Sequence, residues 1–143
     1  MPKSILVIGG TRFFGRLLVR RMLAEGHAVT LATRGLAADD FGNAVERVRV
    51  DRRDREAMIV AFAGRRFDLV YDQMCYSPLD AAISAEVFAG CVDRYVMTST
   101  IEVYDHIRDT ILRPFIETDV NLTREFIVLG PVDKVRHPYP YSG

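Results

Sequence analysis

A short glycine-containing segment near the N-terminus holds the residues whose types and spacing best predict chemistry. It reads Gly9-Gly10-Thr11-Arg12-Phe13-Phe14-Gly15 and joins an apolar run at 5–8 to a segment with helical spacing. Gly9 allows a sharp turn out of a strand, and Gly15 lets the next helix pack closely on the sheet. The free N–H groups of the first helical turn attract a pyrophosphate. This context predicts a dinucleotide-binding turn; the alternative is a turn that merely uses glycines.

Two arginines bear on which dinucleotide such a turn would bind. A site that prefers NAD usually places Asp or Glu at the end of the second strand, on the ribose 2′-hydroxyl. Here that place holds Ala32-Thr33-Arg34, and the next carboxylate is Asp39. Arg34 can neutralise a 2′-phosphate, and Arg12 is near enough to help or to contact the pyrophosphate. We therefore expect NADP to be preferred over NAD, the alternatives being a solvated Arg34 and an Arg12 that crowds the cofactor.

The elements that must position these residues alternate along the chain. The patterning predicts strands at 5–8, 28–32, 45–50, 67–71 and 94–98, and helices at 13–25, 52–63 and 77–89. Strands that alternate with helices specify a parallel sheet with right-handed crossovers. We therefore predict an α/β fold over residues 1–104, with a doubly wound, mostly parallel sheet of five strands. Residues 105–143 hold four of the six prolines and are expected to form an irregular tail.

Local signals define the ends and faces of these helices. Gly26 stands where a glycine closes the first helix, and Ser77-Pro78 is typical of a helix start. The apolar stripe of the first helix is expected to contain Phe14, Leu17, Leu18 and Leu23.

The glycine turn resembles that of the extended and atypical short-chain dehydrogenases/reductases, which carry Gly-x-x-Gly-x-x-Gly. The match here is Gly9, Arg12 and Gly15, so an arginine replaces the middle glycine. The string is most similar to NAD-dependent epimerase/dehydratase proteins near the chloroplast stem-loop-binding branch. The resemblance implies an NAD(P)-binding Rossmann fold, here incomplete relative to the family. It also implies an oxidoreductase, epimerase or dehydratase acting on a nucleotide-sugar or similar small-molecule substrate.

The resemblance implies two further cofactor contacts. Asp51 closes the third predicted strand, where the family's Asp binds the adenine amino group. The alternative is that Asp51 or Asp54 caps the following helix. Asp72-Gln73 stands where the family carries a small residue or Asn that lines the ribose and nicotinamide, so Asp72 is a candidate cofactor-binding carboxylate.

The resemblance also implies catalytic hydroxyl groups. Thr98-Ser99-Thr100 precedes Val103-Tyr104 as in the family, which assigns the substrate-orienting hydroxyl to Thr100, with Ser99 as the alternative. Tyr141 resembles the family's acid/base Tyr in Tyr-x-x-x-Lys, but the chain ends at Gly143, before that Lys. A Tyr without its Lys keeps a pKa near ~10. We therefore expect the chain to be a fragment of a longer protein or a truncated product, and we expect its catalysis to be impaired when it acts alone. The alternative is a non-catalytic module that senses NADP or binds RNA or protein.

Composition excludes several other classes of function. Nineteen Lys and Arg balance nineteen Asp and Glu, which does not favour wholesale binding to nucleic acid or anionic lipid. The arginines of a local basic cluster alternate with carboxylates, so we expect a solvated face and not an RNA site. The cluster comprises Arg47, Arg49, Arg52, Arg53 and Arg55.

The remaining features concern location and assembly. No apolar run approaches the ~20 residues needed to span a bilayer, and the N-terminus lacks a signal-peptide pattern. We therefore expect a cytoplasmic protein with reduced thiols at Cys75 and Cys91, and the scattered histidines predict no metal site. A five-stranded open sheet exposes an edge, so we expect a homodimer or a tail that covers it.

Overall fold

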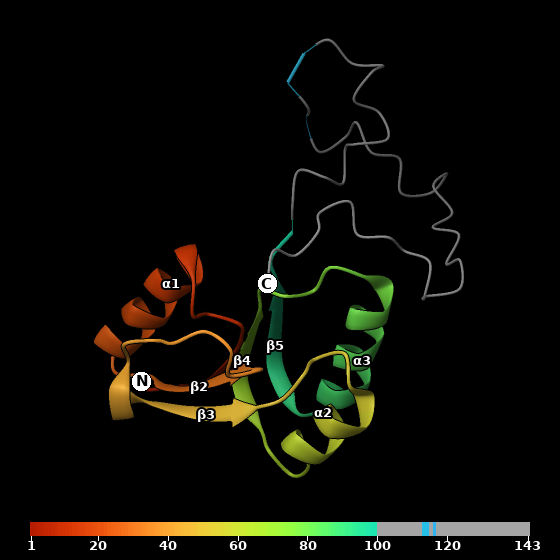
Figure 1. The fold of residues 1–143 in the computed structure, drawn as a ribbon, viewed down its shortest axis with the longest axis horizontal. Coiled ribbons are helices and arrows are strands. Elements are labelled where there is room, and N and C mark those ends of the chain that lie inside the picture. Colours follow the sequence, from red (N-terminus) through yellow and green to blue (C-terminus); the bar gives the residue numbers. More distant parts are fainter. Residues whose placement is uncertain (100–112, 115, 117–143) are drawn as a thin grey trace. The chain divides into compact units, whose positions relative to one another are not determined.

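Five strands and three α-helices alternate along the first unit of the chain (Figure 1). The structure, a computed structural model, describes residues 1–99, 113, 114 and 116, and its contacts divide the chain into Met1–Thr98 and Ser99–Gly143. The strands are β1 (Ser4–Ile8), β2 (Ala28–Thr33), β3 (Val45–Arg49), β4 (Phe67–Asp72) and β5 (Val92–Met97). The helices are α1 (Phe13–Ala24), α2 (Arg55–Phe62) and α3 (Pro78–Phe88).

All the strands are parallel, in the order β3-β2-β1-β4-β5. The chain adds β2 and β3 on one side of β1 and then β4 and β5 on the other, which confirms the doubly wound α/β prediction. Ligands of open α/β sheets bind at such a reversal, outside the carboxyl ends of the strands. Ile8 is paired with Asp72, so the residues that follow β1 and β4, Gly9 and Gln73, lie at this reversal.

The core lies on both faces of the sheet, and β1 contributes to each. One face packs against α1, and the other packs against α2 and α3, which Figure 1 shows on opposite sides. The α1 face includes Ile5, Val7, Val19 and Met22. The opposite face includes Leu6, Ile8, Met58 and Ile83. A strand buried on both faces has no polar side, which explains the unbroken apolar run of β1.

Helix α1 packs through a different stripe from the one predicted. Its buried residues are Gly15, Val19 and Met22. Phe14 and Leu17 are 57% and 64% exposed, so their predicted place in the core is wrong. The physical reason is the close approach at Gly15, where an added Cβ would lie 3.0 Å from the Gly10 Cα. This contact sets the rotation of the helix about its axis and leaves Phe14 and Leu17 on the exposed side.

Side-chain caps set where the other helices begin. The Asp54 carboxylate accepts from the Ala57 N–H at 2.9 Å, so α2 begins at Arg55 and not at the predicted residue 52. Ser77 accepts from the Asp80 N–H at 3.2 Å, which confirms the predicted start of α3. Gly26 has a φ of +81° and follows α1, as its sequence position predicts.

Candidate functional site

The turn after β1 adopts a backbone that only glycine takes up readily. Gly9 and Gly10 have φ values of +97° and +89°. The Gly9 N–H donates to the Ala32 carbonyl at 2.9 Å, which joins the turn to β2. A Cβ on Gly10 would lie 2.9 Å from Val7 Cγ1, closer than side chains can approach. Both glycines are therefore needed for the shape of the turn.

The N-terminus of α1 is open to an anionic group. Arg12 is its N-cap residue, but its exposed side chain makes no cap hydrogen bond, and the first turn has no acidic residue. The first backbone bond of the helix runs from the Arg16 N–H to the Arg12 carbonyl at 3.2 Å. The N–H groups of the preceding helical residues therefore point out of the helix end, where the helix dipole adds positive potential. Thr11 lies partly buried in the same turn.

Two phenylalanines flank this helix end without being buried. Phe13 is 87% exposed and has a φ of +45°, a conformation uncommon outside glycine. Phe14 is 57% exposed. Exposed aromatic side chains beside an unpaired helix end form a surface suited to binding, and a strained residue is often found at such sites.

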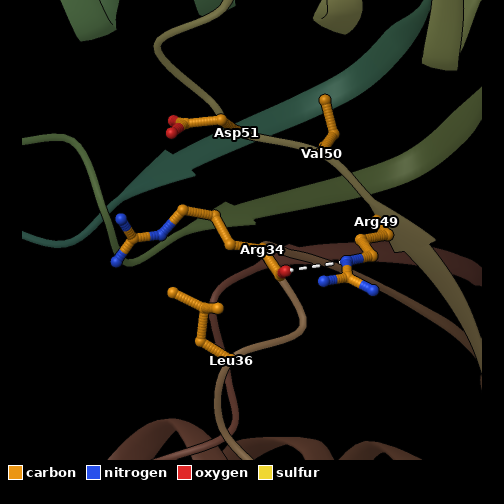
Figure 2. Close-up of a pocket in the computed structure, with 5 residues that line it drawn as sticks. All are labelled: Arg34, Leu36, Arg49, Val50 and Asp51. Carbon is orange, nitrogen blue, oxygen red and sulfur yellow. Dashed lines mark hydrogen bonds between the residues drawn. The ribbon is translucent and has the colours of Figure 1, made fainter.

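A second open feature lies at the carboxyl ends of β2 and β3. It is a shallow pocket of about 310 Å³ lined by Arg34, Leu36, Arg49, Val50 and Asp51 (Figure 2). Figure 2 shows the Arg34 side chain extending between Asp51 and Leu36. The Arg49 Nε donates to the Arg34 carbonyl at 3.0 Å. The pocket thus combines two guanidinium groups, one carboxylate and apolar surface.

Asp51 does not cap the helix that follows it. The alternative that Asp51 or Asp54 caps α2 is confirmed for Asp54, whose carboxylate is the cap. One Asp51 oxygen accepts from the Arg53 N–H at 3.0 Å, which holds the carboxylate at the start of the turn after β3. The side chain is exposed at the pocket. Its contact with an adenine stays a prediction.

Asp72 is instead placed inside the protein, with no exposed area. Its carboxylate pairs with Arg52 at 2.9 Å and accepts from the Met74 N–H at 2.9 Å and from the Tyr95 hydroxyl. Burial, followed by the hydrogen bond to Asp72, raises the pKa of Tyr95 above its usual value. A fully enclosed carboxylate does not line the open edge of the sheet, in contrast to the expected contact with a cofactor.

Arg52 explains this placement, and it is the one arginine of the basic cluster that does not lie on a solvated face; Arg47, Arg49, Arg53 and Arg55 are exposed, as expected. Arg52 is 8% exposed, and besides Asp72 it donates to the Asp80 carbonyl at 2.6 Å and to Ser84 Oγ at 2.7 Å. A buried cation requires such partners, because removal from water is otherwise costly. The arginine therefore draws Asp72 inward.

The other arginines of the basic cluster also have acceptors within the protein. Arg47 pairs with Asp39, Arg53 with Asp80 and Arg55 with Glu86. The fourth, Arg49, donates to a backbone carbonyl in the pocket. Paired guanidinium groups present less free positive charge than the sequence run suggests.

The candidate catalytic residues lie at and beyond the end of β5. Ser99 is exposed and follows that strand by two residues. Thr100 and Tyr141 lie outside the described residues, so all three roles stay predictions. Within the part of the chain that is described, no group of three or more His, Cys, Asp or Glu side chains could hold a metal. In that same part, no helix has the length and apolar character to cross a membrane.

Three residues near the candidate site were missed from the sequence: Leu36, Arg49 and Gln73. Arg49 could have been predicted from the sequence as a site residue, because Thr33 pairs with Arg49 when β3 lies beside β2. Leu36 lies in a loop that carries no periodic signal. Gln73 was noticed only as a departure from the resembling family.

Comparisons with known proteins found a matching family model and two similar proteins of known name. The family model described as NAD dependent epimerase/dehydratase matches residues 5–126. The chain is 36% identical over 83 residues to the chloroplast stem-loop binding protein of 41 kDa b from Arabidopsis thaliana, covering 49% of this chain and 22% of that protein. It is 34% identical over 97 residues to 2′-dehydrokanamycin reductase from Streptomyces kanamyceticus, covering 68% of this chain and 27% of the reductase. The chain thus spans about a quarter of the length of these relatives.

Solved structures share the fold. The Bordetella bronchiseptica enzyme WbmG, solved in complex with NAD, has a TM-score of 0.62 at 15% identity, covering 73% of this chain and 39% of that one. The epimerase Mth375 from Methanothermobacter thermautotrophicus has a TM-score of 0.61 at 20% identity, covering 71% of this chain and 36% of that one. At these identities the likeness concerns the fold alone.

Proposed function

This chain belongs to the NAD dependent epimerase/dehydratase family, and on that premise we propose that it binds a nicotinamide dinucleotide and prefers NADP to NAD. One observation carries the preference. The residues at the end of β2 include Arg34 and no Asp or Glu, and Arg34 lines the pocket together with Asp51 and Arg49. A 2′-phosphate needs cationic partners, whereas a 2′-hydroxyl is usually bound by Asp or Glu at this place.

The glycine turn fits the pyrophosphate of such a cofactor. Gly9 and Gly10 keep side chains away from the backbone of the turn, and the α1 N-terminus directs N–H groups outward. Arg12 adds an exposed guanidinium that can bind a phosphate bidentately. Phe13 and Phe14 supply apolar surface beside these polar groups.

The pocket at β2 and β3 fits the adenosine half. Leu36 and Val50 offer apolar contacts for the flat faces of the adenine ring, and the Asp51 carboxylate can accept its amino group. Arg34 binds the 2′-phosphate. Arg49 is held in place by the Arg34 carbonyl through Nε, so its terminal nitrogens stay available to the same phosphate.

In this proposal the residues that take part in the reaction follow β5 in the sequence. The bound dinucleotide supplies hydride transfer to or from a substrate carbon. In the whole protein, the Thr100 hydroxyl, or that of Ser99, orients the carbonyl or hydroxyl group of the substrate, and Tyr141 exchanges a proton with that group. For the whole protein we propose a nucleotide-sugar or similar polyol as substrate. The 34% identity to a reductase supports an oxidoreductase of this general kind.

Melting of the purified chain with no ligand, with NADP⁺ and with NAD⁺ tests the proposal. A ligand at a hundred times its dissociation constant adds about 2.7 kcal/mol to stability, which raises the melting temperature by several degrees. The chain has no Trp, so calorimetry or a dye reports the transition better than intrinsic fluorescence. We expect the larger rise with NADP⁺. No rise with either dinucleotide would contradict binding, and a larger rise with NAD⁺ would contradict the preference.

A further inference from the structure

The side chain of Gln73 lies against the glycine turn at the reversal point of the sheet. Its backbone N–H donates to the Ile8 carbonyl at 3.1 Å, which continues the pairing of β4 with β1. A Cβ added to Gly15 would lie 2.1 Å from Gln73 Oε1 and 3.0 Å from its Cδ. A Cβ added to Gly9 would lie 3.6 Å from the Gln73 Cβ. The side chain of the residue that follows β4 thus lies beside both Gly9 and Gly15.

The amide nitrogen of this side chain is buried without a partner. Gln73 Nε2 makes no hydrogen bond to any of the described residues. Buried polar groups of native proteins are almost always paired, because an unpaired donor loses its bonds to water and gains none in return. An unpaired nitrogen in a side chain beside the glycine turn therefore points to an acceptor that a ligand of the turn supplies.

A purely space-filling role accounts poorly for an amide at this position. Leu or Met would fill a similar volume without burying a polar group, and Met74 already packs on the same turn, with its Cγ 3.0 Å from a Cβ on Gly9. The free backbone groups of the α1 N-terminus are N–H donors, so they cannot accept from Gln73. The nearest proposed acceptors are the oxygens of a ligand held by the turn.

We propose that Gln73 is a ligand-binding residue of the glycine turn, whose Nε2 donates to an oxygen of the dinucleotide's pyrophosphate or of the ribose joined to it. This inference rests on the proposed binding of a dinucleotide. It assigns Gln73 to recognition of the phosphate–ribose linkage, whereas Arg34 recognises the 2′-phosphate. The binding energy of the whole cofactor then includes the pairing of a donor that is unpaired in the free protein.

The test compares two ligands on Gln73→Leu and on the control variant Met74→Leu. NADP⁺ contains the pyrophosphate, and adenosine 2′-monophosphate contains only the adenosine and 2′-phosphate that the pocket would hold. We expect Gln73→Leu to weaken NADP⁺ binding by about tenfold, as for the loss of a hydrogen bond to a charged group. Its affinity for adenosine 2′-monophosphate and its melting temperature without ligand should stay at or above those of the wild type. Met74→Leu should leave both affinities unchanged.

The outcomes separate this inference from the proposed function. If the wild-type chain binds no dinucleotide, both fail. If it binds NADP⁺ and Gln73→Leu binds equally well, only the inference fails. Equal weakening of both ligands together with a lower melting temperature would show a structural role and would also overturn it. An NMR titration of the wild-type chain needs no variant: the Gln73 side-chain NH₂ signals should shift with NADP⁺ and stay in place with adenosine 2′-monophosphate.

Discussion

The Arg49 Nε donates a hydrogen bond to the Arg34 carbonyl oxygen at 3.0 Å, which ties the loop after β2 to the last residue of β3. Through this contact, two guanidinium groups line one pocket together with Asp51 (Figure 2). The loop is further held by the Gly35 N–H, which donates to Thr33 Oγ1 at 3.2 Å. The fold therefore holds the backbone of Arg34 and the Nε of Arg49 in place at the pocket.

Arg34→Ser should remove the preference for NADP. The loss of a charge-assisted bond to the 2′-phosphate should weaken NADP⁺ binding by about tenfold to a hundredfold, since each ~1.4 kcal/mol is a factor of ten. NAD⁺ lacks that phosphate, so its affinity should change by less than about twofold. Isothermal titration calorimetry measures both. Arg21→Ser is the matched control, because Arg21 is exposed near the far end of α1. Equal weakening of the two dinucleotides in Arg34→Ser would contradict the assignment.

Gly15→Ala should destabilise the chain. The added methyl group would meet Gln73 Oε1 at 2.1 Å and the Gly10 Cα at 3.0 Å, so the helix or the turn must shift. Overpacking of this kind usually costs about 1–3 kcal/mol, which lowers the melting temperature by several degrees. The double variant Gly15→Ala/Gln73→Ala should recover only part of the loss, because the contact with the Gly10 backbone remains. A Gly15→Ala chain that melts like the wild type would refute this close packing.

Asp72→Asn should destabilise the chain strongly. It leaves the buried Arg52 without its nearest counter-charge, a change worth about 3 kcal/mol in comparable buried pairs. The double variant Arg52→Met/Asp72→Leu removes both charges and should be more stable than Asp72→Asn. Urea unfolding provides the comparison, with Asp93→Asn on the exposed side of β5 as the control. A loss below about 1 kcal/mol in Asp72→Asn would contradict a buried pair.

Acid should destabilise the chain through carboxylates held by arginines. Hydrogen bonds from Arg65 and then from Thr30 lower the pKa of Glu46 below its ordinary value of 4.5. A carboxylate whose pKa is lower in the folded state stabilises that state above the unfolded pKa. This contribution is lost as pH falls through the folded pKa. Melting temperatures should therefore fall from about pH 5 downward, and less steeply in Glu46→Gln. An identical pH profile in Glu46→Gln would exclude this contribution.

The alternation of strands and helices and the glycine turn could be predicted because both depend on residues that are close together in the sequence. The apolar run of β1, the glycine pair and the cap at Ser77 each depend on residues a few positions apart. The same patterns predicted a mostly parallel sheet of five strands, because strands that alternate with helices form parallel sheets. Asp51 and Arg34 were found because each follows a predicted strand.

The buried cluster and the face of α1 could not be predicted because they depend on contacts between distant segments. Arg52 and Asp72 are separated by 20 residues, and the pattern around Arg52 is that of a solvated surface. Phe14 has the apolar character of a core residue, but the close packing of Gly15 decides which side of the helix is buried. Gln73 carries no local signal of its contact with the turn.

An NMR titration of the ¹⁵N-labelled chain with NADP⁺ tests the central claim most directly, because it reports where the ligand binds. The account predicts that the largest amide shifts occur at Gly9, Gly10 and Gly15 in the turn, and at Arg34 and Asp51 in the pocket. With NAD⁺ at the same concentration, the shifts at Arg34 should be smaller. Shifts confined to α2 and α3, or none at saturating NADP⁺, would contradict a dinucleotide site at the carboxyl ends of these strands.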